Sequence, residues 1–215
     1  MSSLKRGILL SVEGIDGSGK STLAKKIKSL LEKNNFPVLL TYEPGDTRLG
    51  KEIRKILQER EFDICGKAEF LLFASDRAQH FTEVIIPHLK QKKIILSDRM
   101  ADSSVAYQGY GRGENIEMIH NINKWAMQNR EPDLIFYIQV SFESAIARLE
   151  KRKETPTVFE KEEKAFIKKL ITGFDEILKQ KKNVILLDGE QPADIVAEDA
   201  YKKLITWIEK KNLTI

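Results

Sequence analysis

The sequence predicts an α/β fold of three layers, in which a five-stranded parallel sheet carries helices on both faces. Five short, apolar, β-branched runs alternate with segments of helical periodicity, which is the pattern of buried parallel strands joined by crossover helices. A glycine-rich motif follows the first run and opens directly into a helical segment. In open parallel sheets, the ligand crevice lies at the carboxyl ends of the strands.

The predicted elements follow one another in simple alternation along the chain. We expect strands at residues 8–12, 38–41, 94–97, 134–140 and 184–187. We expect helices at residues 21–34, 49–58, 66–91, 116–129, 142–153, 160–180 and 193–211. With 215 residues, of which 41% are hydrophobic, the chain can bury one sizeable core, so we predict a single domain over residues 1–215.

Charge and cysteine content favour a cytoplasmic protein with small-molecule partners. The net charge is +4, from 36 basic and 32 acidic residues spread along the whole chain, which argues against a dedicated nucleic-acid binder. The single cysteine, Cys65, cannot form an internal disulfide. No apolar stretch approaches the length of a membrane span, so we expect no membrane partner.

The glycine-rich motif is a P-loop. It meets the pattern G-x-x-x-x-G-K-[ST], whose glycines let backbone N–H groups point at phosphate oxygens while the following helix presents its positive end. Lys20 would reach the β- and γ-phosphates, and Ser21 would ligate Mg²⁺. The predicted cradle for ATP consists of Gly14, Ile15, Asp16, Gly17, Ser18, Gly19, Lys20, Ser21 and Thr22.

The cradle alone indicates a triphosphate and not a reaction. GTPase switches share it, but they also carry an [NT]-K-x-D segment that reads guanine. The nearest stretch here, Asn123-Lys124-Trp125-Ala126, lacks the aspartate, so we set the switch interpretation aside.

A second phosphate-handling group follows the third predicted strand. Asp98 is placed like the acidic residue that holds the magnesium shell in P-loop proteins, and Arg99 next to it could fork onto a phosphate. The alternative is a structural salt bridge between the two, although neighbours on a strand point to opposite faces.

The acceptor is predicted to be a phosphate. A phosphate monoester is largely dianionic at neutral pH and needs no general base, so the protein must mainly position two anions that repel each other. Cations should therefore crowd the site. The candidates are Arg77, Arg99, Arg148 and Arg152.

Several segments, in this order and spacing, resemble the bacterial thymidylate kinases over about residues 7–190. They are Glu13 to Thr22 around the P-loop, Glu43-Pro44-Gly45, Leu71 to His80, Asp98-Arg99, Ser103 to Gly109 and Pro132-Asp133-Leu134. The resemblance implies phosphoryl transfer from ATP to thymidine monophosphate with Mg²⁺. It also implies a homodimer that forms through helices flanking the sheet.

Carried over position by position, the resemblance implies a role for each acceptor-side residue. Phe73 would stack on thymine, Arg77 would hydrogen-bond the base edge and Arg99 would grip the acceptor phosphate. The rest of the substrate pocket would be formed by Glu43, Pro44, Ser104, Tyr107 and Gln108, with Tyr107 crowding the sugar where a 2′-hydroxyl would sit. Asp16 would contact either the magnesium or the acceptor side. Core packing is the alternative for Phe73, and a surface helix position is the alternative for Tyr107.

Two segments depart from the family pattern. The family often has Arg-Glu-Pro-Gly-Gly where this chain has Tyr42-Glu43-Pro44-Gly45-Asp46, so a cation is lost and a carboxylate is gained near the expected acceptor phosphate. Arg48 is a candidate to compensate.

The lid, at about residues 148–160, lacks the Gly-x-x-Asp-Arg-x-Glu run that is usual when the cradle has no arginine. We therefore nominate Arg148 and Arg152, one helical turn apart, as the catalytic cations, with a solvated basic face as the alternative.

Two other functions stay open on the sequence alone. A related kinase could use another pyrimidine monophosphate, or a deoxynucleoside, as acceptor. A P-loop protein could also bind ATP as a regulatory ligand without transferring it, since fold does not fix function.

Overall fold

The computed structural model describes residues 4–59, 62–151, 159 and 162–214. Its centre is a five-stranded, wholly parallel sheet with the strand order β2-β3-β1-β4-β5. The strands are β1 (Ile8–Glu13), β2 (Val38–Tyr42), β3 (Ile94–Asp98), β4 (Leu134–Gln139) and β5 (Val184–Asp188). The predicted strands are thus confirmed, with each boundary within one residue of the prediction.

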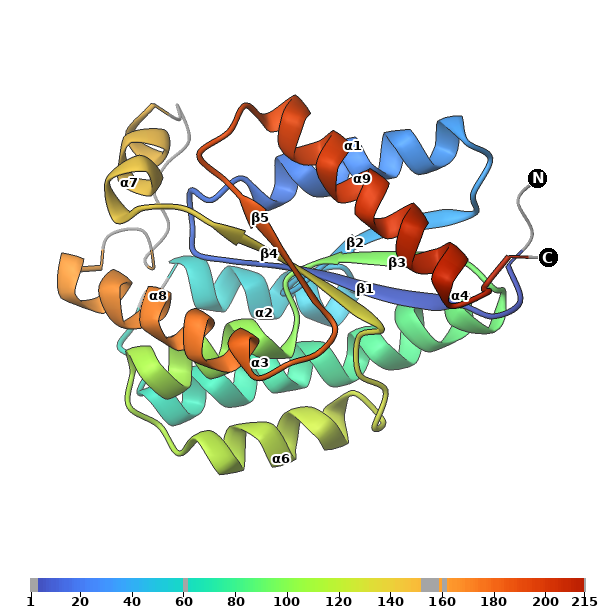
Figure 1. The fold of residues 1–215 in the computed structure, drawn as a ribbon. Coiled ribbons are helices and arrows are strands. Elements are labelled where there is room, and N and C mark those ends of the chain that lie inside the picture. Colours follow the sequence, from blue (N-terminus) through green and yellow to red (C-terminus); the bar gives the residue numbers. More distant parts are fainter. Residues whose placement is uncertain (1–3, 60–61, 152–158, 160–161, 215) are drawn as a thin grey trace.

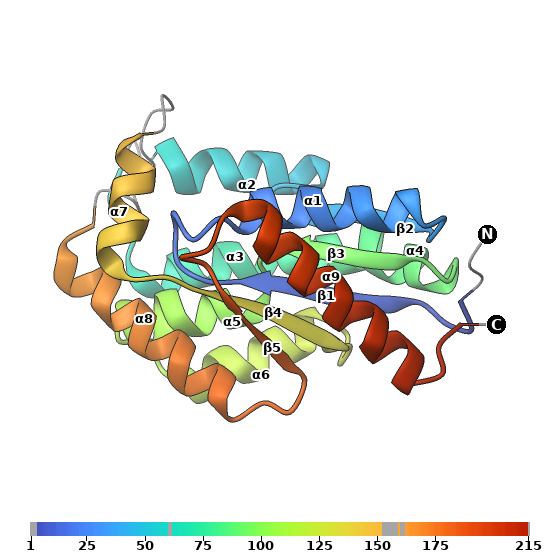
Figure 2. The ribbon, with the colours of Figure 1, turned by 45° about the horizontal axis from the view of Figure 1, so that its top comes forward.

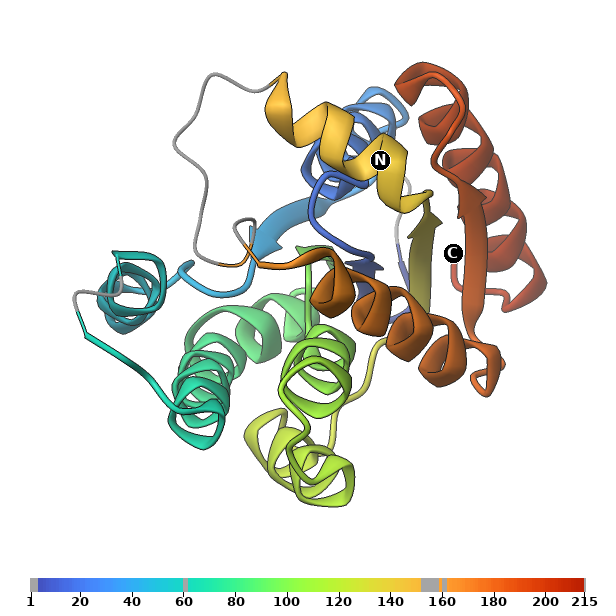
Figure 3. The same ribbon diagram turned by 90° about the vertical axis from the view of Figure 1, so that its left-hand side faces the viewer.

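Helices cover both faces of the sheet (Figures 1 and 3). On one face lie α1 (Lys20–Lys33) and α9 (Ala193–Lys210), packed on alternate strand residues such as Leu10 and Phe136. The opposite face is covered by α3 (Gly66–His80), α6 (Ile116–Ala126) and α8 (Lys164–Lys179), with Ile135 and Tyr137 in the core beneath them. The predicted three-layer α/β fold is therefore confirmed.

The remaining helical segments are shorter or lie near the carboxyl ends of the strands. They are α2 (Arg48–Glu59), α4 (Ile86–Lys90), α5 (Ala101–Ser104), α7 (Phe142–Glu150) and two π-helical segments, η1 (Phe81–Ile85) and η2 (Val105–Gly111). Of these, η1 and α4 continue α3 toward the amino end of the sheet, where α4 lies near the chain termini (Figure 1). Figure 2 shows α7 at the edge where β1 and β4 end, while the two chain termini lie at the opposite end of the sheet. There, Lys5 N–H donates to the Leu213 carbonyl at 2.8 Å.

Two predicted helices differ from the observed ones in instructive ways. The predicted helix 66–91 is a continuous helical run that changes to π-helical geometry at Phe81. The predicted helix 116–129 ends at Ala126 because Gln128 and Asn129 adopt left-handed backbone angles. The expected starts and ends near residues 153 and 160 lie outside the described residues.

The helical segment α5–η2 was not predicted at all. Its sequence contains Gly109 and Gly111, which weaken a helical pattern. At Gly111 a Cβ atom would lie only 2.6 Å from the ring of Phe166 on α8. The glycine therefore lets η2 pack closely on α8, and tertiary packing overrides local propensity.

None of the helices in the described parts of the chain combines the length and the apolar character that a membrane span requires.

Candidate active site

One continuous cavity of about 820 Å³ opens at the carboxyl ends of the strands. A cavity of this size is in the range of small-molecule sites. It brings together most of the residues predicted from the sequence: Asp16, Gly17, Gly19, Lys20, Ser21, Thr22, Glu43, Pro44, Phe73, Arg77, Asp98, Arg99, Ser104, Tyr107, Gln108 and Arg148. The same loop contains Gly14, Ile15 and Ser18, which do not line the cavity, and Arg152 lies outside the described residues.

The phosphate cradle is formed by backbone geometry. Gly17 and Gly19 have φ angles of 80° and 98°, which other residues adopt only with strain. A Cβ atom on Gly17 would also lie 2.4 Å from the carbonyl oxygen of Ala145. Gly19 caps α1, so the free N–H groups and the positive end of this helix face the cavity. The cradle is thus a preformed anion site.

Lys20 is held inside this cradle. Its side chain is buried, and Nζ donates to the Ile15 carbonyl at 2.6 Å. Burial and the nearby Arg99 lower the pKa of Lys20 to about 8. A bound polyphosphate would favour the charged amine, so the ammonium group is set to meet an anion.

Ser21 and Asp98 meet across the cavity, where the Ser21 hydroxyl donates to Asp98 Oδ2. Hydroxyl and carboxylate oxygens are ligands that suit Mg²⁺, which usually takes one or two protein oxygens together with phosphate oxygens and water. No cluster of three or more His, Cys, Asp or Glu side chains suited to a metal occurs among the described residues. The pair therefore fits a magnesium ion that arrives with a nucleotide.

Arg99 bridges the cradle and the second half of the cavity. Its guanidinium donates to the Gly14 carbonyl at 3.1 Å, to Ser103 at 3.0 Å and to Asp16 at 2.5 Å. The side chain of Asp98 turns instead to Ser21, so the described contacts do not support the alternative of a structural Asp98–Arg99 pair. Arg99 also has a φ angle of 72°, a strained value at the end of β3.

Asp16 belongs to the acceptor half of the cavity. Its two carboxylate oxygens accept hydrogen bonds from Arg99 and from the Tyr107 hydroxyl, the latter at 2.8 Å. Burial alone would raise the pKa of Asp16, but Arg99 and Lys20 outweigh burial and lower this pKa to about 2. Of its two predicted roles, the geometry favours contact with the acceptor side over contact with magnesium.

Aromatic rings wall the far end of the cavity. Phe73 is half-buried and lines the cavity, so core packing does not account for it. Tyr107 is buried, with its ring 5.0 Å below the Arg99 guanidinium, so the surface alternative for Tyr107 is wrong. The ring of Phe159 lies 6.0 Å from that of Phe73 and 5.8 Å from that of Tyr107. Such walls suit a planar base.

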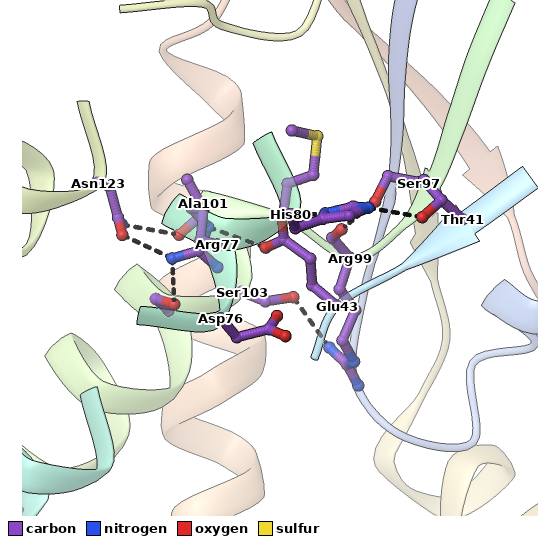
Figure 4. A network of polar contacts seen from close by, with 12 residues as sticks. Thr41, Glu43, Asp76, Arg77, His80, Ser97, Arg99, Ala101, Ser103 and Asn123 are labelled. Atoms are coloured by element: carbon purple, nitrogen blue, oxygen red, sulfur yellow. Dashed lines mark hydrogen bonds and ion pairs between the residues drawn. The ribbon is translucent and has the colours of Figure 1, made fainter. Parts of the chain in front are cut away.

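Arg77 is anchored by side chains from three elements (Figure 4). Nε donates to Glu43 at 2.9 Å, and Nη1 donates to Ser104 at 3.2 Å and to Asn123 at 2.6 Å. Arg77 and Glu43 are both buried, yet both line the cavity. Burial alone would raise the pKa of Glu43, but Arg77 and His80 hold it below its usual range. The ion pair thus fixes a guanidinium at the wall of the acceptor pocket.

Gln108 and the loop near Tyr42 complete this half. Gln108 donates to Glu69 at 2.8 Å, and its own carbonyl oxygen is buried with no hydrogen-bond partner among the described residues, so it can accept a hydrogen bond from a ligand. Arg54 lies 5.6 Å from the centre of the Tyr42 ring and donates to the Pro44 carbonyl at 2.8 Å.

Arg54 supplies a cation near the position where the family has an arginine. It lines the cavity, while Arg48 is exposed and does not. Asp46 accepts a hydrogen bond from Thr41 instead of lining the cavity. The replacements at Tyr42 and Asp46 therefore leave this end of the cavity cationic.

Arg148 is held by two backbone carbonyls. It donates to the Gly189 carbonyl at 2.6 Å and to the Ser18 carbonyl at 3.5 Å, and it lines the cavity. It is therefore not part of a solvated basic face. The larger part of the predicted lid, with Arg152, lies outside the described residues.

Several functional neighbours escaped the sequence analysis. Glu13 accepts from Met100 N–H at 2.8 Å and from the Ser103 hydroxyl at 2.6 Å, and burial and the nearby Asp102 raise its pKa to about 7. Asn123 appeared only as a failed guanine motif, and Arg54 and His80 looked like ordinary helix residues. A search for ionisable residues within apolar stretches would have pointed to His80 on α3 and Glu13 on β1, because both are fully buried.

Comparison with known proteins agrees with this geometry. The sequence profile of the family described as thymidylate kinase matches residues 12–200. The thymidylate kinase of Halothermothrix orenii is 38% identical over 203 residues, covering 93% of this chain and 97% of that protein. The thymidylate kinase of Kosmotoga olearia is 38% identical, with 94% and 98% covered, and that of Finegoldia magna is 36% identical, with 96% and 100% covered. The chain therefore belongs to the thymidylate kinase family.

Proposed function

We propose that this chain, as a member of the family that phosphorylates dTMP to dTDP with ATP, performs the transfer inside the single cavity described above. ATP would lie on the cradle from Gly14 to Thr22, and dTMP would lie among Phe73, Arg77, Arg99 and Tyr107. One observation carries this placement. The same cavity is lined at one end by the phosphate cradle and at the other by aromatic walls and a fixed guanidinium.

The chain's own residues would act by positioning and by charge. The attacking phosphate oxygen of dTMP is already ionised, so no side chain needs to remove a proton. Lys20 and the amino end of α1 would hold the donor phosphates, and Arg99 would hold the acceptor phosphate close to them. Because Asp16 pairs with Arg99, it would keep the guanidinium in place until dTMP binds.

Mg²⁺ would be held by Ser21 and Asp98, whose oxygens lie together in the cavity. When bound, the ion neutralises charge on the transferring phosphates.

Base recognition would combine stacking with hydrogen bonding. Phe73 would stack on thymine without strong base choice. Arg77 and the unpaired carbonyl of Gln108 would then read the base edge, and Tyr107 would crowd the position of a 2′-hydroxyl. Ser104 supports Arg77, while Glu43 and Pro44 shape the turn beside it.

The lid would supply the remaining catalytic charge. Residues 1–215 would act as one kinase domain whose lid, at about residues 148–160, closes over both substrates and excludes water. Since Arg148 is bound to backbone carbonyls, Arg152 is the better candidate for the cation that stabilises the phosphoryl group during transfer. Arg152→Ala should lower kcat by a factor on the order of 10³ and change ATP binding little. Unchanged turnover would assign that charge to another residue.

A panel of acceptors with coupled detection of ADP tests the proposed reaction. We expect dTMP to give the highest kcat/KM, with other pyrimidine monophosphates below it and deoxythymidine at the background rate. Preference for another monophosphate or for a nucleoside would change the substrate assignment. ATP binding with no ADP formed on any acceptor would favour a regulatory ATP-binding protein.

We also propose a homodimer that forms through helices flanking the sheet. Leu71 on α3 and Met118 and Trp125 on α6 are exposed apolar side chains on two helices that pack together. Sedimentation of the full chain would show a single species of twice the monomer mass. The cytoplasmic location and the lack of nucleic-acid or membrane partners stay predictions.

A further inference from the structure

A buried polar cluster adjoins the acceptor pocket, and its central side chain has no part in the proposed reaction. Its centre is His80, the last residue of α3, which is 0% exposed and does not line the cavity. Nδ1 of His80 lies 2.9 Å from Glu43 Oε1, and Nε2 lies 2.6 Å from the Thr41 hydroxyl oxygen. The Thr41 hydroxyl also lies 2.5 Å from Asp46 Oδ2 (Figure 4 shows His80 between Glu43 and Thr41).

Counting donors shows that this chain of contacts needs one extra proton. The Glu43 carboxylate only accepts hydrogen bonds, so Nδ1 of His80 must carry a proton. The Thr41 hydroxyl has a single hydrogen, which can serve Asp46 or Nε2 of His80 but not both. If it serves Asp46, Nε2 must donate to Thr41. If it serves Nε2, Asp46 must be protonated.

The extra proton belongs on His80, since an imidazole takes up a proton far more readily than a carboxylate does. The charged groups around the ring agree with this. Glu43 and Asp46 face it from the end of β2 and the following turn, and Asp76 and Arg77 face it from α3. Ser97, on β3, is uncharged. Even without Asp76, whose pKa is raised to about 7, the carboxylates of Glu43 and Asp46 against one guanidinium leave room for a second positive charge.

We propose that His80 is held as an imidazolium between Glu43 and the Thr41–Asp46 pair, and that in this form it positions Glu43 and, through Glu43, the guanidinium of Arg77 at the acceptor pocket. The Glu43 carboxylate binds both cations: Oε2 accepts a hydrogen bond from Arg77, and Oε1 accepts one from His80. A charged donor makes a shorter and stronger hydrogen bond than a neutral one, so the imidazolium stiffens this wall. His80 is a positioning residue, because it acts through Glu43.

This inference also gives Asp46 a role. The sequence analysis flagged Asp46 as an extra anion near the acceptor phosphate. Its carboxylate accepts a hydrogen bond from the Thr41 hydroxyl, which in turn contacts Nε2 of His80. The positive charge proposed on His80 therefore balances the negative charge of Asp46 inside the protein. The functional part of the inference rests on the proposed dTMP kinase reaction, but the protonation of His80 does not.

The first test is the protonation of the ring nitrogens of His80 in the full chain. Nitrogen-15 NMR at pH 8 would use His88→Gln and His120→Gln to assign the signals. We expect both ring nitrogens of His80 to carry protons in the wild type, and Nε2 to lose its proton in Asp46→Ala. The control, Asp63→Ala, changes an exposed loop carboxylate and should leave His80 unaltered. An unprotonated ring nitrogen in the wild type, or no change in Asp46→Ala, would overturn the proposal.

The second test is kinetic. Asp46→Ala should raise the KM for dTMP about fivefold, because the hydrogen bond from His80 to Glu43 then has a neutral donor in place of a charged one. The kcat and the KM for ATP should stay within about twofold of wild type. Asp63→Ala should keep all three at wild-type values. An unchanged KM for dTMP in Asp46→Ala would refute the positioning role. If the wild type did not phosphorylate dTMP at all, the proposed reaction would fail, and the NMR result would still decide the protonation.

Discussion

The two ends of the cavity are built by different means. At the cradle, backbone N–H groups and glycine conformations within nine consecutive residues form the anion site, and Lys20 is its main charged side chain. At the acceptor end, the site consists of side chains from several elements, joined by buried ion pairs and hydrogen bonds such as those of Arg77 with Glu43 and Asn123. The donor end is therefore a local structure, and the acceptor end is a tertiary one.

This difference teaches where substitutions act. A change in the cradle should affect donor phosphates and turnover, whereas a change at the acceptor end should affect dTMP, the stability of the fold, or both. The predictions below break or sharpen that separation, from the largest expected effect to the smallest.

Lys20→Ala should break the donor end alone. Losing the only buried amine of the described cradle removes charge from the transferring phosphates, so kcat should fall by a factor on the order of 10³. Lys33, in the same helix, is exposed and does not line the cavity, so Lys33→Ala is the matched control. Steady-state kinetics should show the KM for dTMP within about twofold of wild type. A large rise of that KM would contradict the separation.

Arg99→Ala should test the one residue that joins the two ends. Arg99 contacts Gly14 in the cradle and Ser103 and Tyr107 on the acceptor side. We expect kcat/KM for dTMP to fall about 10²-fold, while the dissociation constant of ATP changes less than about threefold. Equal losses for both substrates would show that Arg99 belongs to the cradle.

Asp76→Asn should affect stability and leave the reaction nearly unchanged. Burial, and next Glu43, raise the pKa of Asp76 from 3.8 to about 7. A raised pKa in the folded state stabilises the fold at low pH, and this contribution is lost as pH rises from about 4 to 7. Asparagine keeps the acceptor for Gly45 N–H at 3.0 Å and cannot ionise.

The free energy of unfolding of Asp76→Asn should therefore depend less on pH in this range than that of the wild type. One pKa unit corresponds to about 1.4 kcal/mol, so a gain of roughly 1–4 kcal/mol at pH 8 is expected. Urea unfolding between pH 4 and 8 measures it, with Asp63→Asn as the control. Parallel pH profiles would show that Asp76 does not carry this linkage.

The donor end was predictable from sequence because its chemistry is contiguous. Strand, glycines, lysine and helix follow one another, so residues Gly14 to Thr22 needed no tertiary information. The strand order of the sheet, by contrast, cannot be read from the alternation of strands and helices. The helical segment from Ala101 to Gly111 was also hidden, since packing of Gly111 on α8 decides it.

The acceptor end was predictable only as far as the family resemblance named its residues. That resemblance pointed to Phe73 and Arg77, but the partners of Arg77 lie 34, 27 and 46 positions away along the chain. The burial of His80 could not be read from its own segment, because it depends on the sheet beside it. Arg54 likewise becomes visible as the replacement cation only when α2 is placed over Tyr42.

The most direct test of a local donor site beside a tertiary acceptor site is a calorimetric titration of Arg77→Lys. Lysine keeps the positive charge but cannot serve Glu43, Ser104 and Asn123 at once. We predict that the dissociation constant of dTMP rises at least about tenfold, while that of a non-hydrolysable ATP analogue stays within about twofold. Equal weakening of both ligands, or unchanged binding of dTMP, would contradict the account.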